Sequence, residues 1–246
     1  MDLSFRQTRL NHACKAQIKP LIRTFQMPAE EILYRSGSLS EGGDSGFVPY
    51  DGRPWGGKDV DAVFRFSLAI PPELEGKPAI LQLSTDGNGG WAAANPQPLV
   101  FVNGQIRQGM DSNHTTLLLA ESARQGERYE VVCDCWSAMT EEKSFFAASL
   151  ISVDRQTEGL YYDLAVGAET TAVLEDSHPQ KDRMLTVLTD ALDLVDLRRP
   201  HSPAYDQSVL AAREYLRENF YEAYSNHDMV LHAIGHTHID VAWLWR

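Results

Sequence analysis

The feature that most constrains the fold is a change of hydrophobic period near Val153. From about residue 60 to residue 152, apolar and polar side chains alternate in short runs of the kind that form half-buried strands. Turn-forming residues separate these runs at intervals of roughly 8 to 12 residues, which favours an antiparallel β-sandwich. After Val153 the apolar residues recur at helical spacing. The chain is therefore predicted to be α+β, with the strands first and helices after them.

The predicted strands end at turn signals. Pro71-Pro72 follows the first strand, a Gly-rich run beginning at Asp86 follows the second, and Asn103-Gly104 follows the third. Because Asn and Gly both tolerate positive φ, Asn103-Gly104 predicts a tight hairpin turn. The six runs predicted to be strands are 62–70, 79–85, 99–102, 115–120, 129–136 and 145–153.

Three apolar faces at helical spacing follow the strands, and they include Leu164, Leu188 and Leu216. A single apolar run over 229–235 comes next and is predicted to be a strand. Such a strand needs a partner sheet, because an unpaired hydrophobic edge promotes aggregation.

The N-terminal part of the chain is predicted to be different in character. Residues up to Met27 are compatible with a helix that is interrupted or ends near Pro20. The Gly- and Ser-rich stretch 36–46 is predicted to be an exposed loop.

Composition excludes two classes of partner. A net charge of −12 argues against nucleic acid and against an anionic membrane surface. The polar N-terminus lacks the apolar core of a signal peptide, and no window is long and apolar enough to span a membrane. We therefore expect a cytoplasmic protein that binds neither nucleic acid nor membrane. Cys133 and Cys135 are too close in sequence for an unstrained disulfide, so buried, reduced thiols are expected.

The end of the chain carries the residues with the clearest chemistry. His236, His238 and Asp240 follow the apolar run at alternating positions, so on a strand their side chains share a face. Two imidazoles and a carboxylate are ligand types that zinc takes in proteins. Trp243 and Trp245 follow at once, and a tryptophan there could stack on a sugar or simply pack in a core. The spacing would also suit a metal-dependent amidohydrolase-like hydrolase, although such barrels usually open near the start of the protein.

The run from Gly235 to Trp245 strongly resembles the first catalytic motif of the glycoside hydrolase family 38 α-mannosidases. The cytosolic-type enzymes of that family, which carry an N-terminal β-sandwich domain, are the most similar group. A weaker resemblance covers most of the chain upstream of the motif. It is carried by Trp55-Gly56, Gly76-Lys77, Val102-Asn103-Gly104, 109–114 and 223–227.

The resemblance implies a division of the chain into four parts. These are an N-terminal helical segment over 1–27, a β-sandwich domain over 28–155, a helical linker region over 156–227, and the truncated start of an α/β catalytic barrel over 228–246.

The resemblance also implies a zinc-dependent, retaining enzyme that acts on mannose-containing oligosaccharides or glycans. In this sequence His238 and Asp240 would be zinc ligands, and Trp243 would stack beneath the mannose ring. His236 would lie beside the metal and orient a ligating carboxylate. Zinc in the family holds the sugar's 2- and 3-hydroxyls, and two carboxyl groups carry out the displacement. The longer enzyme is a candidate for homo-oligomerisation.

The family's nucleophile, its other zinc ligands and its acid/base residue lie well downstream of this motif, so none is expected among these 246 residues. The carboxylates of Glu214, Glu218 and Asp228 match no family motif and are assigned no role. We therefore expect the chain by itself to have no mannosidase activity. Turnover of an aryl α-mannoside by the purified 246-residue chain would contradict this expectation.

A binding module is the main alternative of another class. The β-sandwich could bind carbohydrate through the turn that ends in Trp91, although a hairpin turn with a core tryptophan is the simpler interpretation. Asp111, Asn113 and His114 follow a Gly-Met turn and are candidates for reaching a neighbouring active site.

Overall fold

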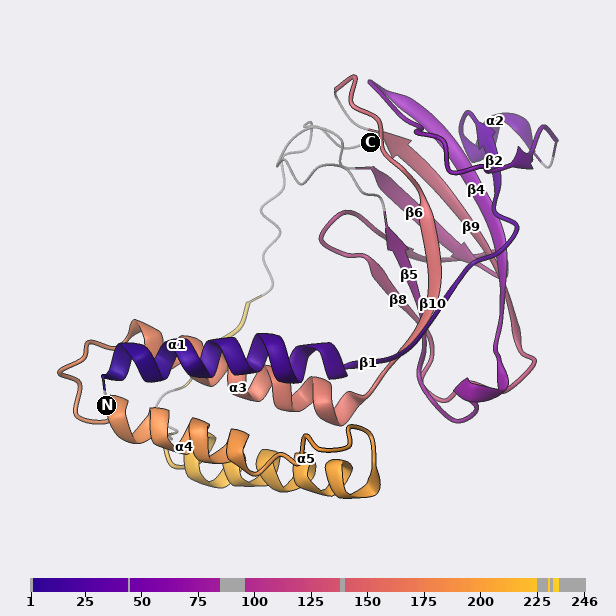
Figure 1. The fold of residues 1–246 in the computed structure, drawn as a ribbon. Coiled ribbons are helices and arrows are strands. Elements are labelled where there is room, and N and C mark those ends of the chain that lie inside the picture. Colours follow the sequence, from indigo (N-terminus) through magenta and orange to yellow (C-terminus); the bar gives the residue numbers. More distant parts are fainter. Residues whose placement is uncertain are drawn as a thin grey trace. The chain divides into compact units, whose positions relative to one another are not determined.

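The computed structural model describes residues 2–43, 45–84, 96–137, 140–224, 230 and 232–234. These residues form two compact units (Figure 1). The helical unit contains the described residues up to Thr24 and from Val153 onward, and the two-sheet unit contains those from Phe25 to Ser152. The structure is α+β, as the sequence predicted.

The two-sheet unit is built from a four-stranded and a six-stranded sheet. The first has the order β1-β10-β5-β8, and the second has the order β3-β2-β4-β9-β6-β7. The strands are β1 (Arg23–Pro28), β2 (Leu33–Ser36), β3 (Val48–Pro49), β4 (Val60–Ala69), β5 (Ala79–Ser84), β6 (Gln97–Val102), β7 (Gln105–Gly109), β8 (Thr116–Ala120), β9 (Arg128–Ser137) and β10 (Ala147–Val153).

The longest pairing joins β4 and β9, which run antiparallel from Val60 opposite Ser137 to Ala69 opposite Arg128. Alternate residues of both strands are buried, because successive side chains of a strand point to opposite faces.

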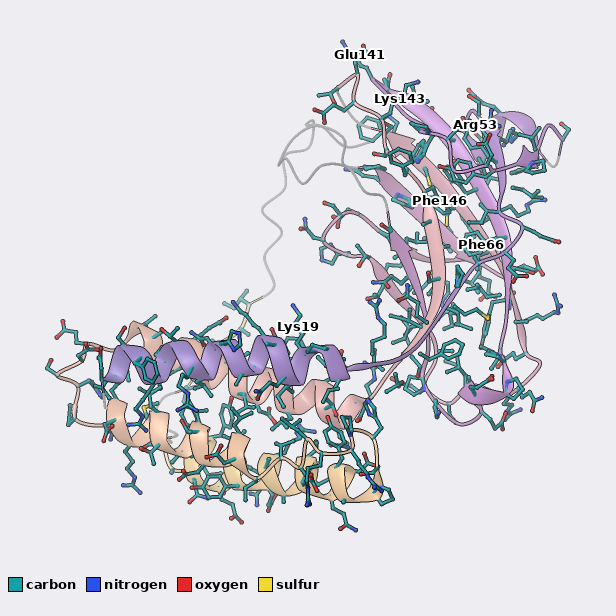
Figure 2. The ribbon with its side chains drawn as sticks, in the orientation of Figure 1. Lys19, Arg53, Phe66, Glu141, Lys143 and Phe146 are labelled. Carbon is teal, nitrogen blue, oxygen red and sulfur yellow. The ribbon has the colours of Figure 1, made fainter. Side chains whose placement is uncertain are left out.

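The two sheets share one hydrophobic core. The rings of Phe64 on the six-stranded sheet and Phe146, which precedes β10, stack with their centroids 3.9 Å apart. Figure 2 shows Phe146 and Phe66, which also belongs to this core. Two antiparallel sheets around one core are the arrangement of a β-sandwich.

The six predicted strands correspond to β4, β5, β6, β8, β9 and β10. Asn103 and Gly104 have φ values of 52° and 76°, which confirms the predicted turn between β6 and β7. The helical segment at the N-terminus ends at Leu21, close to Pro20 as predicted, and β1 begins at Arg23. The short strands β2 and β3 were missed because too few residues alternate in them to give a signal.

The stretch 36–46, predicted to be an exposed loop, has no buried residue among those described. It also contains a helical turn that was not predicted, α2 (Leu39–Gly42), which begins with a capping box made by Ser38 and Glu41. In a capping box each of the two side chains accepts a hydrogen bond from the backbone N–H of the other residue, and this stabilises the first turn of the helix. The backbone N–H of Leu39 donates to Asp134 Oδ1 at 3.1 Å, so this turn is tied to the outer face of β9.

The helical unit contains four α-helices with short irregular turns beside them. The helices are α1 (Leu3–Ala13), α3 (Arg155–Val173), α4 (Lys181–Asp193) and α5 (Pro203–Leu216). The turns are η1 (Cys14–Ile18) and η2 (Lys19–Leu21) after α1, and η4 (Arg217–Tyr221) after α5; a further turn, η3 (Pro72–Leu74), belongs to the two-sheet unit.

These helices enclose a second hydrophobic core with contributions from α1, α3, α4 and α5. The Gln7 side chain joins α1 to α3, because its Nε2 donates to the carbonyl oxygen of Ala168 and its Oε1 accepts from Thr171 Oγ1. The segments predicted as a separate N-terminal helix and a helical linker thus pack together as one unit. Sequence spacing could not reveal this, because α1 and α3 are far apart along the chain.

The run predicted as a strand over 229–235 lies partly outside the described residues. Val230 and residues 232–234 have no regular secondary structure, and Ile234 is 85% exposed. The predicted strand is therefore absent at these four residues.

Two predictions from composition can be compared with the described residues. Cys133 and Cys135 are free and buried, as expected. In the described part of the chain, no helix is long and apolar enough to cross a membrane.

The packing of α3 against α4 depends on Gly167. A Cβ atom there would lie 2.5 Å from Cδ2 of Leu188, a fully buried side chain. We expect Gly167→Ala to lower the free energy of unfolding by about 1–3 kcal/mol through overpacking, measured by urea denaturation.

Gly159→Ala in the same helix is the matched control. A Cβ there would meet the guanidinium of Arg213, which is partly exposed and can move away. The helix propensity of Ala is about 1 kcal/mol better than that of Gly, which offsets the displaced contact. Equal destabilisation by the two substitutions would contradict this account of the α3–α4 contact.

Candidate functional site

The predicted metal-binding motif lies outside the described residues. His236, His238, Asp240 and Trp243 all fall after Ile234, the last residue that the structure describes. The roles assigned to them from the sequence therefore remain predictions.

The donor types of this motif fit zinc, because imidazole nitrogen and carboxylate oxygen are both ordinary zinc ligands. Within the described residues, no group of three or more His, Cys, Asp or Glu side chains could hold a metal ion. The terminal motif thus stays the candidate for metal chemistry in this chain.

The cysteines are unsuited to metal binding or nucleophilic catalysis. Burial raises the pKa of Cys133 and of Cys135 well above the ordinary thiol value, and burial raises that of Cys14 to about 11. Since the thiolate is the form that ligates metals and attacks electrophiles, these protonated thiols act as small core side chains.

The loop of Asp111, Asn113 and His114 is held together by its own hydrogen bonds. Asp111 Oδ1 accepts from the backbone N–H of Asn113 at 2.8 Å and of His114 at 2.7 Å. The same oxygen lies 3.0 Å from His114 Nδ1. The Asp111 carboxylate is therefore occupied in shaping the turn, and the His114 side chain that lies beside it is 72% exposed.

The surroundings of Asp111 favour the charged form of its carboxyl group. Burial alone would raise the pKa of Asp111, but the donors from His114 and Asn113 outweigh it and hold the pKa below its ordinary value.

The upstream residues that carried the family resemblance have structural roles here. Trp55 is 3% exposed and packs edge-on against Phe64. A Cβ at Gly56, whose φ is 85°, would lie 2.7 Å from Ser137 Oγ. That hydroxyl donates to the carbonyl of Gly57 at 2.8 Å and accepts from its N–H at 3.1 Å. Ser137 thus fixes the loop before β4, a role that sequence reasoning missed.

Two of the carboxylates that were assigned no role from the sequence lie among the described residues, and both form local ion pairs. Glu214 and Glu218 both form ion pairs with Arg217 on an exposed helix face. Such exposed pairs are salt-screened and add little stability, and nothing in their surroundings indicates catalysis.

Grooves lie in both units among the described residues. In the helical unit, a groove of about 740 Å³ lies between α1 and the segment after α4. In the two-sheet unit, a groove of about 430 Å³ lies between residues 27–33 and β4, with Arg128 and Glu130 beside it. Neither was predicted, because each is formed by segments that are distant in the sequence.

Comparison with known proteins supports the family resemblance. No family model matches the sequence. Mouse alpha-mannosidase 2C1 is 24% identical over an alignment of 263 residues that covers 99% of this chain. The resemblance to the α-mannosidases is confirmed. The chain spans 23% of the length of this relative, so activity of the whole relative does not transfer directly to it.

Solved structures give a weaker match. A β-glucuronidase from Ruminococcus gnavus in complex with D-glucaro-d-lactam is 12% identical, with a TM-score of 0.37 over 54% of this chain and 30% of that chain. The apo form of a Ruminococcus gnavus β-glucuronidase gives the same identity and TM-score, over 54% of this chain and 29% of that one. Similarity at this level does not establish a shared fold.

The Asp111 loop gives a testable pH dependence. Because the folded-state pKa is lowered, the carboxylate stabilises the loop above its ordinary pKa of about 4, and this stabilisation is lost as the pH falls through the lowered value. A carboxyl NMR titration should find the Asp111 midpoint below the ordinary value. His114→Ala should move that midpoint upward, but only part of the way, because the two backbone donors remain.

Asn113→Ala is the control for this titration, because residue 113 donates through its backbone. An Asp111 midpoint that is unchanged in His114→Ala, or that moves equally in both variants, would show that the imidazole does not lower the pKa of Asp111.

Proposed function

We propose that this chain is the N-terminal region of a zinc-dependent, retaining α-mannosidase that hydrolyses α-mannosidic bonds in oligosaccharides or glycans. The observation that carries the proposal is the alignment of nearly the whole chain with mouse alpha-mannosidase 2C1. The H-x-H-x-D-x-x-W pattern from His236 to Trp243 supports it independently, since it contains both metal-ligating and sugar-stacking residue types.

In this proposal His238 and Asp240 hold the metal. His236 lies next to them in sequence and orients a ligating carboxylate through a hydrogen bond, a common arrangement around bound metals. Trp243 offers its apolar face to the mannose ring. Bound zinc would supply a Lewis acid that holds vicinal hydroxyl oxygens of the sugar.

The two units described by the structure have a supporting role in this proposal. Each has its own hydrophobic core. Their role is to form a folded body ahead of the motif. A cytoplasmic location and assembly into homo-oligomers remain predictions of the same proposal.

The alternatives from the sequence are less well supported. The match to an α-mannosidase favours a glycosidase over a metal-dependent amidohydrolase. A carbohydrate-binding role for the two-sheet unit remains a prediction, since Trp91 lies outside the described residues.

The test uses the chain together with any sequence that its gene encodes beyond Arg246. We expect that protein to contain zinc and to hydrolyse an aryl α-mannoside. His238→Ala and Asp240→Asn should lower both the zinc content, measured by elemental analysis, and kcat/KM by at least about a hundredfold, since ligand loss weakens the metal site.

His232→Ala is the matched control, because His232 is an exposed histidine that precedes the motif. It should keep full zinc content and activity. Thermal unfolding of all three variants separates loss of the metal from loss of the fold. Full zinc content and activity in His238→Ala would contradict the assignment.

A further inference from the structure

The groove of about 740 Å³ in the helical unit lies between two helices that are tied together near their N-terminal ends. The Arg6 guanidinium of α1 donates to Asp182 and to Thr186, which both lie in the first half of α4. Further along, side chains from residues 10–17 line one side of the groove, and side chains from residues 189–197 line the other. We call this feature the α1–α4 groove.

The floor of the α1–α4 groove is apolar. Leu10 and Val195 are buried there, and Leu192 and Leu197 are partly buried against the same hydrophobic core. Ala13 lies one helical turn after Leu10 on the same face, and its single methyl group leaves space above the floor. Part of the core of the helical unit is therefore open to solvent along this groove.

The dimensions of the groove suit a helix. From Arg6 to Gln17 the groove follows eleven residues of helical backbone, which is about 16 Å or three turns. A helix of this length that is half embedded between two others fills roughly 600 Å³, for a diameter of about 10 Å. This volume is close to that of the α1–α4 groove.

One edge of the groove is basic. Although the chain has a net charge of −12, residues 3–23 contain five Lys and Arg residues and no Asp or Glu. Arg9 and His12 are exposed on the α1 edge, three residues apart and so on the same side of the helix. Unlike Arg6, neither side chain has a hydrogen-bond or ion-pair partner among the residues that the structure describes. These two side chains are therefore available to an acidic partner.

The opposite edge is acidic. Asp193 is exposed at the end of α4, and the last turn of that helix contains no basic residue to offset its C-terminal dipole. The neighbouring Asp196 is already paired, because Arg198 donates to both of its oxygens at 2.8 and 2.7 Å. Asp190 lies outside the groove and accepts from the Tyr215 hydroxyl. Asp193 is thus the carboxylate on this edge that a basic partner would meet.

We propose that the α1–α4 groove binds an amphipathic helix of a partner protein. The apolar stripe of that helix covers the groove floor, its acidic flank faces Arg9 and His12, and its basic flank faces Asp193. A small apolar anion would meet the floor and the basic edge but would leave Asp193 without a partner. This inference does not use the terminal motif and is independent of the proposed α-mannosidase activity.

The experiment titrates the purified chain with the synthetic helical peptide LAALEQKLAALEQKLAAL. Its leucines form one stripe, with Glu along one flank of the stripe and Lys along the other. Because the peptide can enter the groove in either direction, one direction always places Glu beside α1 and Lys beside α4. Binding is measured by fluorescence anisotropy of the labelled peptide, and its place by NMR of the Leu192, Val195 and Leu197 methyl groups.

The matched control is the isomer LAALQEKLAALQEKLAAL, which has the same composition but carries Glu on the face away from the leucines. We expect the first peptide to bind and to shift the three methyl groups. The isomer should bind about tenfold more weakly, because it loses the contacts of Glu with the basic edge.

A charge reversal tests the basic edge of the protein. Arg9→Glu should lower the affinity for the first peptide about tenfold and should remove its advantage over the isomer. Lys15→Glu is the control, since it makes the same charge change at an exposed position that does not line the groove. Its effect should be less than about twofold. Equal weakening by the two substitutions would show a response to net charge alone and would overturn the proposal.

A second pair of variants tests the floor. Ala13→Trp fills the groove and should lower the affinity at least about tenfold. Ala16→Trp places the same side chain at an exposed position outside the groove and should leave the affinity unchanged. Thermal unfolding of both variants shows whether the fold is kept. The Arg9→Glu comparison changes no core volume, so it decides the matter if Ala13→Trp does not fold.

Four further outcomes would overturn the proposal. The first is that neither peptide binds, and the second is that both bind equally. The third is concentration-dependent dimerisation that shifts the same methyl groups without peptide, which would assign the groove to a second copy of the chain. The fourth is displacement of the peptide by decanoate at equal concentration, which would assign the groove to a small apolar anion.

Discussion

The antiparallel pairing of β4 with β9 is the interaction on which the two-sheet unit depends. Its register places Phe64 and Cys133 in the same interior and turns Arg65 and Val132 to the outer face. A shift by one residue would exchange the two faces and put the charged residues in the core. The outer face in turn holds α2, through the bond from the Leu39 N–H to Asp134. Core, surface and groove thus follow from one register.

The helical unit has its own interior and does not rely on that register. Asp154 caps the start of α3, and Thr157 Oγ1 lies 2.7 Å from both Asp154 Oδ2 and the buried Tyr205 hydroxyl of α5. A buried hydroxyl without a partner would be costly, so this chain of hydrogen bonds fixes how α3 and α5 meet. Figure 1 shows these helices together with α1 in the helical unit. Separate cores allow each unit to be stable by itself.

The sequence predicted the elements whose signal is local and missed those that tertiary contacts create. Alternation over several residues identified β4 and β9, and period 3.6 identified α3 and α4. In contrast, α2 owes its place to a contact with Asp134, which lies far along the chain. The motif with His238 and Asp240 was predictable for the same reason as the strands, because its residues are close in sequence. The groove along β4 was not, because three separate segments form it.

The conformation of Glu31 limits how far β2 pairs with β4. An extended Glu31 would let β2 continue, cover Ser67 and Ala69, and remove a left-handed conformation that costs about 1–2 kcal/mol in a residue with a side chain. Exposed edges also invite unwanted pairing, and charged neighbours such as Arg128 and Glu130 limit it. The left-handed conformation of Glu31 is accounted for by the crossing between the sheets, because Ala29, two residues earlier, is already hydrogen-bonded to Ala148 of the other sheet.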